Sequence, residues 1–293
     1  MQRQKTKQNN NLNKKQKIMS FNNIEIKAEK SLTALYKLCG FSYLGGIATS
    51  AKMKMSYRHN VATYCIYLAP ADMSGYNVCP NNKHCRQFCL NASGLNKADI
   101  LAHGIEESKT NKARIRKTRL FYENRELFMT IMVMEILKGI EYAKKHNMEF
   151  AVRINGTSDL SLELFKYNGV CILDLFPNVQ FYDYTKVYNR IKLMSKYKNY
   201  DLTLSYNGFN WNDCERFMNE GGRSAVVFEG ELPKAFKGFR VIDGNTYDMR
   251  YMDDNGVIVG LHYHPVASDF VNGHYVSPNT PFVIRQDNSN SIF

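Results

Sequence analysis

Residues 123–154, ENRELFMTIMVMEILKGIEYAKKHNMEFAVRI, decide the fold class of the chain. Residues 123–145 repeat apolar side chains every three or four positions, which predicts one long helix. The polar pair that begins at His146 ends this helix, and residues 150–154 (FAVRI) are then typical of a short buried strand. A long helix that leads directly into an apolar strand is part of a βαβ unit.

The same alternation continues on both sides of this stretch. Residues 63–69 (TYCIYLA) form a β-branched and aromatic run closed by Pro70, which is typical of a strand. Helices between short apolar strands indicate parallel strands that are covered on both faces. Five or six such units without a glycine-rich dinucleotide turn predict an α/β fold, a partial or full parallel β/α barrel with a cysteine loop after its first strand. Further strands are expected at residues 179–183, 202–206, 225–228, 241–243 and 257–261, and further helices at residues 160–167, 187–198 and 211–219.

Composition narrows the classes of protein to which the chain can belong. Apolar residues make up 44% of its 293 residues, which is ordinary for a protein with a packed core. No stretch approaches the roughly 20 consecutive apolar residues of a membrane span, and the basic N-terminus lacks the apolar centre of a secretory signal. We therefore expect a cytoplasmic protein whose seven cysteines are reduced thiols.

Half of the net charge of +12 lies in the first 17 residues, which carry six Lys or Arg and no acidic residue. This segment is rich in Gln, Asn and Lys. We therefore interpret residues 1–20 as a disordered basic tail and residues 21–293 as a single α/β domain. Such a tail can hold a polyanion through phosphate contacts, or it can serve only as a solubilising extension.

Three cysteines stand close together in the polar segment after the first predicted strand. Cys79, Cys85 and Cys89 have the spacing C-x5-C-x3-C. Soft thiolates in such a group select zinc or an iron–sulfur cluster, so we predict a metal site at these three residues. The other four cysteines stand alone in apolar or helical contexts and are expected to pack as small hydrophobes.

The number of protein ligands that the sequence offers distinguishes a structural zinc site from an iron–sulfur cluster. A structural zinc site usually takes four protein ligands, often from paired C-x2-4-C knuckles, and the sequence has no second knuckle. His262 or His264 could supply the fourth ligand only by folding back from the far end of the chain, and an exposed strand face is the favoured interpretation of this pair. Three thiolates can instead hold a [4Fe–4S] cluster with one open iron. We expect iron–sulfur, with zinc as the alternative.

Polar residues and glycines follow the predicted strands, at the end of a β/α barrel where functional loops gather. Turns alone also favour Asn, Asp and Gly. We interpret the loops at residues 155–159 and 183–186 as parts of a site, and the loops after the later strands as turns. The candidate residues are Asn155, Gly156, Thr157, Ser158 and Asp159 in the first loop, and Asp183 and Lys186 in the second.

A second basic segment lies between the cysteine loop and the long helix. Residues 96–119 are polar and basic with scattered apolar positions, which predicts one or two helices. From Lys109 to Arg119, six basic residues spread over two faces of a helix. This surface could contact the phosphates of a nucleic acid or nucleotide. A solvated face is the equally common use of such charges.

Five segments of the chain together resemble the bacteriophage gene product 88 family. The similarity covers roughly residues 35–275 and implies a phage or prophage origin, and thus the cytoplasm of a host cell. It implies no activity, because none is established for the family. The segments are residues 79–89, 114–119, 153–159, 181–186 and 257–260.

A more distant resemblance carries a mechanism. A strand that leads into a three-cysteine loop, a helix and a parallel partial barrel is similar to the radical S-adenosylmethionine enzymes. Phe88 precedes the third cysteine, as an aromatic residue often does in that superfamily. Residues 155–159 stand where the superfamily has a glycine-rich turn that holds the amino group of S-adenosylmethionine. The spacing departs from the usual C-x3-C-x2-C, and the turn has only one glycine, Gly156.

This second resemblance implies roles for the candidate residues. The three cysteines would ligate a [4Fe–4S] cluster whose open iron chelates S-adenosylmethionine, and electron transfer would yield a 5′-deoxyadenosyl radical. Residues 155–159 would orient S-adenosylmethionine, while Asp183 and Lys186 would act as catalytic residues on the substrate side. The substrate would be a nucleotide or a nucleic-acid-related molecule.

The alternative hypothesis is a zinc-stabilised phage protein that binds nucleic acid without catalysis. In that case the cysteine loop binds zinc only to stabilise the fold. The basic tail and the segment from Lys109 to Arg119 bind the nucleic acid. The two hypotheses differ at residues 155–159, which the enzyme needs and the binding protein does not.

Overall fold

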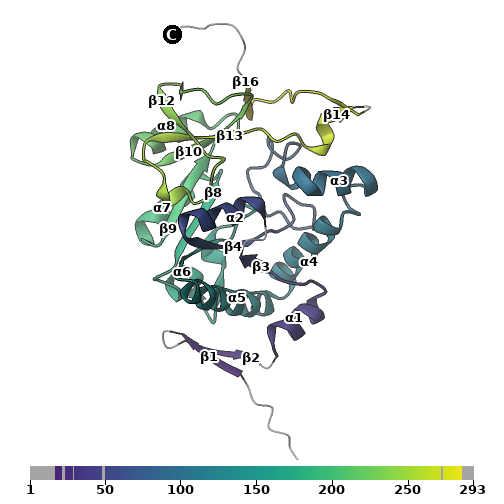
Figure 1. Cartoon of the computed structure of the whole chain (residues 1–293), viewed down its shortest axis with the longest axis vertical. Helices are drawn as coiled ribbons and strands as arrows, with labels where there is room; N and C mark the ends of the chain where they lie inside the picture. The colour runs from purple at the N-terminus through teal and green to yellow at the C-terminus, as the bar shows by residue number, and fades with distance from the viewer. Residues whose placement is uncertain (1–16, 22–23, 29, 48–49, 272, 286–293) are drawn as a thin grey trace, which may run out of the picture.

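The computed structural model of the chain describes residues 17–21, 24–28, 30–47, 50–271 and 273–285 (Figure 1). Its centre is a ten-stranded sheet. The strands are β3 (Gly45–Ile47), β4 (Val61–Ile66), β5 (Glu149–Arg153), β8 (Gln180–Thr185), β9 (Tyr200–Ser205), β10 (Arg223–Glu229), β11 (Ala235–Phe236), β12 (Phe239–Asp243), β13 (Val257–His262) and β16 (Val283–Arg285). Their order is β11-β12-β13-β10-β9-β8-β5-β4-β3, with β16 beside β10, and all neighbours from β12 to β4 run parallel. The predicted α/β class is therefore confirmed.

The sheet is open, so the prediction of a full barrel is wrong. Its edges are β3 and β11, and these two strands do not pair with each other in the described part of the chain. Both edge strands run antiparallel to their neighbours, which makes the sheet mixed. The position of the cysteine segment also needs correction. It follows β4, which is the first of the parallel strands but the fourth strand of the chain.

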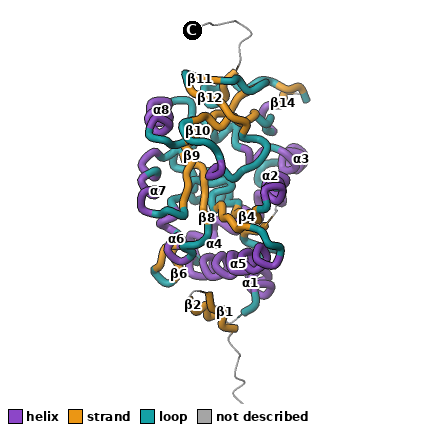
Figure 2. The backbone as a smooth tube through the Cα atoms, turned by 60° about the vertical axis from the view of Figure 1, so that its left-hand side comes forward, coloured by secondary structure: helices purple, strands orange, loops and turns teal. Residues whose placement is uncertain are grey.

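Helices lie on both sides of the central strands. Figure 2 shows α7 (Lys192–Lys196) and α8 (Trp211–Asn219) on one side, and α2 (Ala51–Met55) and α3 (Gly94–His103) on the other. The predicted helix at residues 211–219 is confirmed to the residue by α8. Burial of Cys214, Phe217 and Met218 on one face of α8 explains why its apolar spacing was readable.

One predicted helix, at residues 160–167, is wrong. A single 3-10 turn, Leu162–Leu164, is followed there by a hairpin of β6 (Lys166–Tyr167) and β7 (Val170–Cys171). Asn168 and Gly169 both have positive φ in its turn, which is the conformation that an Asn-Gly pair favours between hairpin strands. The chain then enters α6 (Ile172–Leu175).

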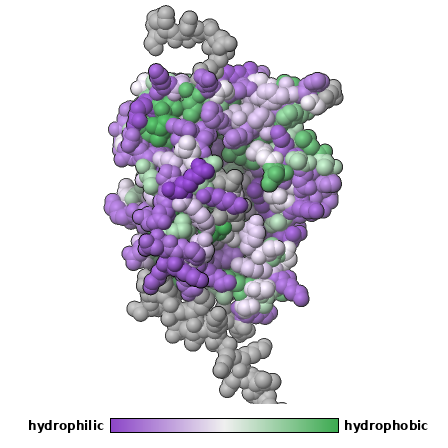
Figure 3. Space-filling view, viewed as in Figure 1, coloured by the Kyte–Doolittle hydropathy of each residue, from purple (hydrophilic) through white to green (hydrophobic). Residues whose placement is uncertain are grey.

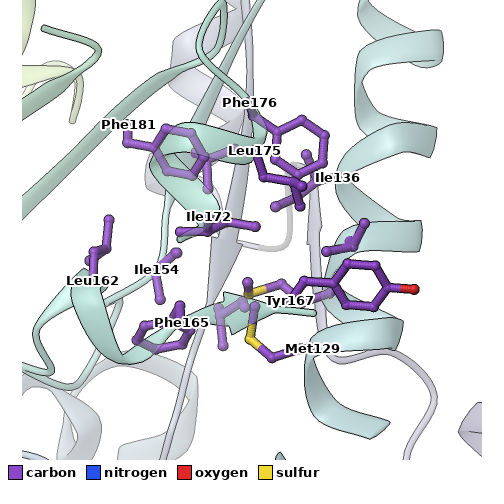
Figure 4. Packing of buried hydrophobic residues seen from close by; sticks show 14 of the residues in the cluster. Met129, Ile136, Ile154, Leu162, Phe165, Tyr167, Ile172, Leu175, Phe176 and Phe181 are labelled. Atoms are coloured by element: carbon purple, nitrogen blue, oxygen red, sulfur yellow. The ribbon is translucent and has the colours of Figure 1, made fainter. Parts of the chain in front are cut away.

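The main apolar core lies between α5 (Arg125–Lys145) and the sheet. α5 starts after α4 (Lys109–Glu123) at Asn124, whose side chain accepts a hydrogen bond from the Leu127 N–H at 3.1 Å. All but one of residues 128–137 are buried, so the middle of α5 is surrounded by apolar side chains. Figure 4 shows Met129 and Ile136 of α5 among side chains from β6 and α6. A fully buried large apolar side chain of this kind contributes about 1.5–3 kcal/mol.

A buried carboxylate ties this core to the edge of the sheet. Glu135 of α5 is 6% exposed. It accepts hydrogen bonds from the hydroxyls of Tyr36 (2.5 Å) and Tyr64 (2.6 Å), and from the backbone N–H groups of Leu44 (2.9 Å) and Gly45 (2.8 Å). Four donors compensate for the loss of water around a buried charge. Glu135 thus fixes α5 against α1 (Leu32–Cys39), β3 and β4.

The N-terminal hairpin of β1 (Lys17–Phe21) and β2 (Ile24–Ala28) lies at the end of the molecule beyond α5 (Figure 1). Most of the predicted basic tail, residues 1–16, lies outside the described residues, and residues 17–20 of that tail belong to β1. Within the described ranges, no helix is both long and apolar enough to cross a membrane. The face seen in Figure 3 is mainly hydrophilic, with scattered apolar areas.

Candidate active site

A cavity of about 350 Å³ lies at the carboxyl ends of the parallel strands. Its wall combines the cysteine segment with residues that lie on or just after β4, β5, β8, β9, β10 and β13. Ligands of open α/β sheets bind at this end of the strands. The strand residues in the wall include Arg153, Tyr184, Ser205, Val227 and Leu261, and Tyr67 follows β4.

The three clustered cysteines all line this cavity. The Cys79 sulfur accepts a hydrogen bond from the Ala71 N–H (3.5 Å) and donates to the Thr157 carbonyl oxygen (3.8 Å). Burial raises the pKa of the Cys79 thiol to about 11, and it also raises the pKa of Cys89. These two thiols are therefore neutral at pH 7 unless a metal or a nearby cation stabilises their thiolates.

The cysteines share the cavity without forming a closed ligand set. Among the described residues, no group of three or more His, Cys, Asp or Glu side chains is arranged to hold a metal ion. The predicted metal site at Cys79, Cys85 and Cys89 therefore stays a prediction. His262 and His264 are both exposed, as the favoured interpretation expected, and they also line this cavity, although only His262 belongs to a strand, β13.

The turn at residues 155–159 is held from behind by a buried pair, Asn155 and Asp183. The Asp183 carboxylate accepts hydrogen bonds from the backbone N–H (2.8 Å) and the side-chain amide (3.0 Å) of Asn155. The Asn155 amide oxygen accepts from the Ser158 hydroxyl (2.8 Å) and from the Leu160 N–H (2.9 Å). These bonds fix the turn, so Gly156, Thr157, Ser158 and Asp159 form part of the cavity wall.

Gly156 is required by close packing of the turn against β4. Its N–H donates to the Ile66 carbonyl oxygen at 2.9 Å. A Cβ atom at position 156 would lie 2.6 Å from that oxygen and 2.7 Å from the Tyr67 ring. Any larger residue would have to push the turn away from β4.

Asp159 joins this turn to the end of β8. Its carboxylate accepts hydrogen bonds from the Thr185 hydroxyl (2.8 Å) and the Lys186 N–H (2.9 Å), and it forms an ion pair with Arg190. Because these partners occupy both carboxylate oxygens, Asp159 acts on the cavity chiefly by positioning Lys186.

The two predicted catalytic residues lie in different places. Asp183 is 1% exposed, belongs to the bonded pair behind the turn and is not part of the cavity wall. Burial raises its pKa to about 7. Lys186 does line the cavity. Burial opposes its charge, but a Cys85 thiolate and the carboxylate of Asp159 raise its pKa overall.

Two further features of the cavity were not predicted as site residues. Arg153 and Asp248 form a buried ion pair with an Nη1–Oδ2 distance of 2.6 Å, and the Arg153 guanidinium lies 4.8 Å from the centre of the Tyr184 ring. Arg114 also lines the cavity, with its guanidinium 5.2 Å from the Tyr67 ring centre. The position of Arg153 at the end of a predicted strand was a usable signal. Asp248 lies in a loop with no regular pattern.

The basic helix predicted from Lys109 to Arg119 is part of α4, and several of its charges have internal partners. Lys112 pairs with Glu107 at 2.5 Å, and the Arg119 Nε donates to the Ser74 carbonyl oxygen at 3.2 Å. Lys117 is only 5% exposed, and burial lowers its pKa to about 8. Phosphate binding by this helix stays a prediction.

A large, open and mostly parallel sheet with helices on both sides, and with a cavity at the carboxyl ends of its strands, makes the chain an α/β protein. The family model described as Gene product 88 matches residues 4–271, so the chain belongs to the gene product 88 family. Neither a curated protein nor a solved structure matches the chain. None of these comparisons links it to the radical S-adenosylmethionine superfamily.

Proposed function

We propose that the chain is an iron–sulfur enzyme whose active site is the cavity at the carboxyl edge of the sheet. The observation that carries the proposal is that three thiols and Lys186 line this one cavity. In the proposal, Cys79, Cys85 and Cys89 hold a [4Fe–4S] cluster, and S-adenosylmethionine binds beside it. The substrate is a nucleotide or a nucleic-acid-related molecule.

The donor set fits such a cluster chemically. Thiolates are the usual protein ligands of iron–sulfur clusters, and three of them leave one iron open. The cysteines lie in residues 67–89, a segment without helix or strand, so they can converge without breaking the hydrogen bonds of the sheet. Lys186 interacts electrostatically with all three thiols and offsets their negative charge when they ionise.

The chemistry supplied by a bound cluster would be one-electron reduction of the sulfonium of S-adenosylmethionine. The protein contributes a cavity wall whose residues are held in place by hydrogen bonds and close packing. Gly156 keeps the turn close to β4, and Ser158 keeps acceptor capacity on its hydroxyl after donating to Asn155. Asp159 holds the backbone of Lys186 at the mouth of β8. Asp183 acts as a positioning residue through Asn155.

We place this chemistry in the cytoplasm of a host cell. All seven cysteines are free thiols in the structure, which suits a reducing compartment. A cluster with an open iron is itself sensitive to oxidation, so the same compartment favours its survival.

The test is metal analysis after anaerobic purification, together with the ultraviolet–visible spectrum. The protein should be brown and contain several irons and sulfides per chain. Replacement of Cys79, Cys85 and Cys89 by alanine should remove the iron and the colour. Cys39→Ala and Cys214→Ala are matched controls, because neither residue lines the cavity, and both should keep the iron.

Two results would overturn this proposal. A colourless protein with one zinc per chain, lost in the triple variant, would favour the zinc-stabilised nucleic-acid-binding alternative. A protein that carries neither metal after anaerobic purification and reconstitution would leave the cavity without a cluster. If iron is bound, addition of S-adenosylmethionine should change the spectrum, and Gly156→Ala should weaken that change.

A further inference from the structure

An open groove of about 710 Å³ runs beside the cysteine segment, outside the cavity. It is formed by the cysteine segment, by the residues after β8 and by the connection from β9 to α8. The proposed enzyme does not use this groove for its cluster, because none of the three clustered cysteines lines it.

The groove presents an aromatic ring to solvent. Phe209 is 65% exposed, although it is a large apolar residue. Its ring centre lies 4.1 Å from that of His84 on the opposite, cysteine-bearing wall. The connection that carries Phe209 is held in place by Asn207, whose side-chain oxygen accepts hydrogen bonds from the N–H groups of Phe209 (2.9 Å) and Asn210 (3.1 Å). The backbone that carries the exposed ring is therefore held in place, and the ring itself lies against His84.

The charges of the groove favour an anion. Lys83, Lys186 and Arg216 line it, against one carboxylate, Asp213, which pairs with Arg216 at 3.0 Å. The Arg216 guanidinium also lies 4.1 Å from the ring centre of Tyr188. Aromatic rings that alternate with Lys and Arg along a groove are the usual site for single-stranded nucleic acid, since bases stack on rings and phosphates contact cations.

The groove and the cavity share a wall. Asn81 and Lys186 line both of them. The Asn81 side-chain amide donates to the Lys186 carbonyl oxygen at 2.9 Å, which links the cysteine segment to the end of β8. A molecule in the groove therefore lies next to the thiol-lined cavity, separated from it by these two residues.

We propose that this groove binds a single-stranded segment of nucleic acid and brings one of its nucleotides to the cavity. The inference names the substrate class of the proposed enzyme and to that extent rests on it. Phe209 and His84 stack bases, and Lys83 and Arg216 contact phosphates. A duplex is excluded, because its bases are already stacked and paired.

The test is fluorescence anisotropy with a labelled single strand of about 12 nucleotides, as DNA and as RNA, and with the corresponding duplex. Either single strand should bind more tightly than the duplex, and the two arms show which sugar is preferred. Phe209→Ala should weaken binding about tenfold by removing a stacking surface. Arg216→Gln should weaken binding and reduce the slope of log K against log salt by about 0.7, the value for one phosphate contact.

Matched controls lie outside the groove. Arg240 is another exposed arginine in an ion pair with an aspartate, and Leu95 is 96% exposed, so Arg240→Gln and Leu95→Ala should bind as the native protein does. Equal losses in the controls, native binding by Phe209→Ala and Arg216→Gln, or equal affinity for the duplex would each overturn the inference. So would displacement of the strand by polyglutamate of matched charge, which has no bases to stack.

Iron content and strand binding, measured on the same samples, distinguish the proposal about the groove from the proposal about the enzyme. Phe209 and Arg216 are exposed and distant in sequence from the cysteines, so both variants should keep their iron. Normal iron content without strand binding would overturn the inference about the groove alone. Strand binding by native protein that holds no iron would overturn the proposed enzyme alone.

Discussion

Two buried carboxylates show how differently two regions of the molecule treat charge, the contact of α5 with the edge of the sheet and the cavity at the carboxyl ends of the parallel strands. Glu135, a residue of α5, accepts four hydrogen bonds from tyrosine hydroxyls and backbone N–H groups. Asp248, at the cavity, instead pairs with Arg153, and the Nε of Arg153 is buried without a hydrogen-bond partner among the described residues. The first arrangement supplies two donors to each carboxylate oxygen and so links α5 to the edge of the sheet. The second keeps polar groups at the wall of a cavity, which is where a ligand can use them.

The largest effect is expected at the closed network. Glu135→Ala leaves the buried Tyr64 hydroxyl, the half-buried Tyr36 hydroxyl and two N–H groups without their acceptor, so the free energy of unfolding should fall by about 4 kcal/mol. Urea unfolding followed by circular dichroism measures this loss. Glu141 lies on the same helix and is exposed, so Glu141→Ala should change stability by less than about 0.5 kcal/mol. A loss below about 1 kcal/mol for Glu135→Ala would contradict the role given to this carboxylate.

A smaller loss is expected at the cavity. Asp248→Asn leaves the buried Arg153 guanidinium without its counter-charge and should lower the free energy of unfolding by about 3 kcal/mol. The exposed pair of Arg240 and Asp254 provides the control, because Asp254→Asn should cost less than about 1 kcal/mol. Equal effects in these two variants would show that water reaches the Arg153–Asp248 pair. The comparison between the two regions would then fail.

The last effect is a gradual dependence of stability on pH, which is small per pH unit. Burial raises the pKa of Asp183 from 3.8 to about 7. The folded state therefore binds more protons than the unfolded state between these pH values, and the contribution of Asp183 to stability is lost as pH rises toward 7. The slope reaches at most about 1.4 kcal/mol per pH unit. Asp183→Asn should flatten the plot of unfolding free energy against pH between 4 and 7. Parallel plots for the two proteins would contradict the raised pKa.

Local signals in the sequence predicted the local parts of the fold. The helices α5 and α8 were readable because their apolar residues recur with helical spacing over two or more turns. Strands of two or three residues, such as β3, β11 and β16, have no period to read. Whether the sheet closes depends on whether distant edges meet, and no local pattern carries that information. The β6–β7 hairpin was missed although Asn168-Gly169 is a hairpin signal.

The sequence predicted where the candidate site lies better than it predicted which side chains form its wall. Loops after parallel strands do converge on one cavity, so residues 156–159 and Lys186 lie in its wall together with the three cysteines. Asp183 shows a limit of this reasoning, because it belongs to the same predicted loop but does not line the cavity. Side chains alternate along β8, so Tyr184 faces the cavity and Asp183 faces Asn155 behind the turn. The inward position of Arg114 depends on how α4 packs, which the sequence does not show.

The cysteine segment forms a wall of both the cavity and the groove. Cys79, Cys85 and Cys89 face one side, and Lys83 and His84 line the other. Binding at one face that favours a particular conformation of the segment must therefore alter affinity at the other face. Thermodynamic linkage makes the two changes equal. If bound metal increases the affinity for a strand by some factor, the bound strand increases the affinity for metal by the same factor. If the proposed cluster and the proposed strand both bind, this one short segment couples the two binding events.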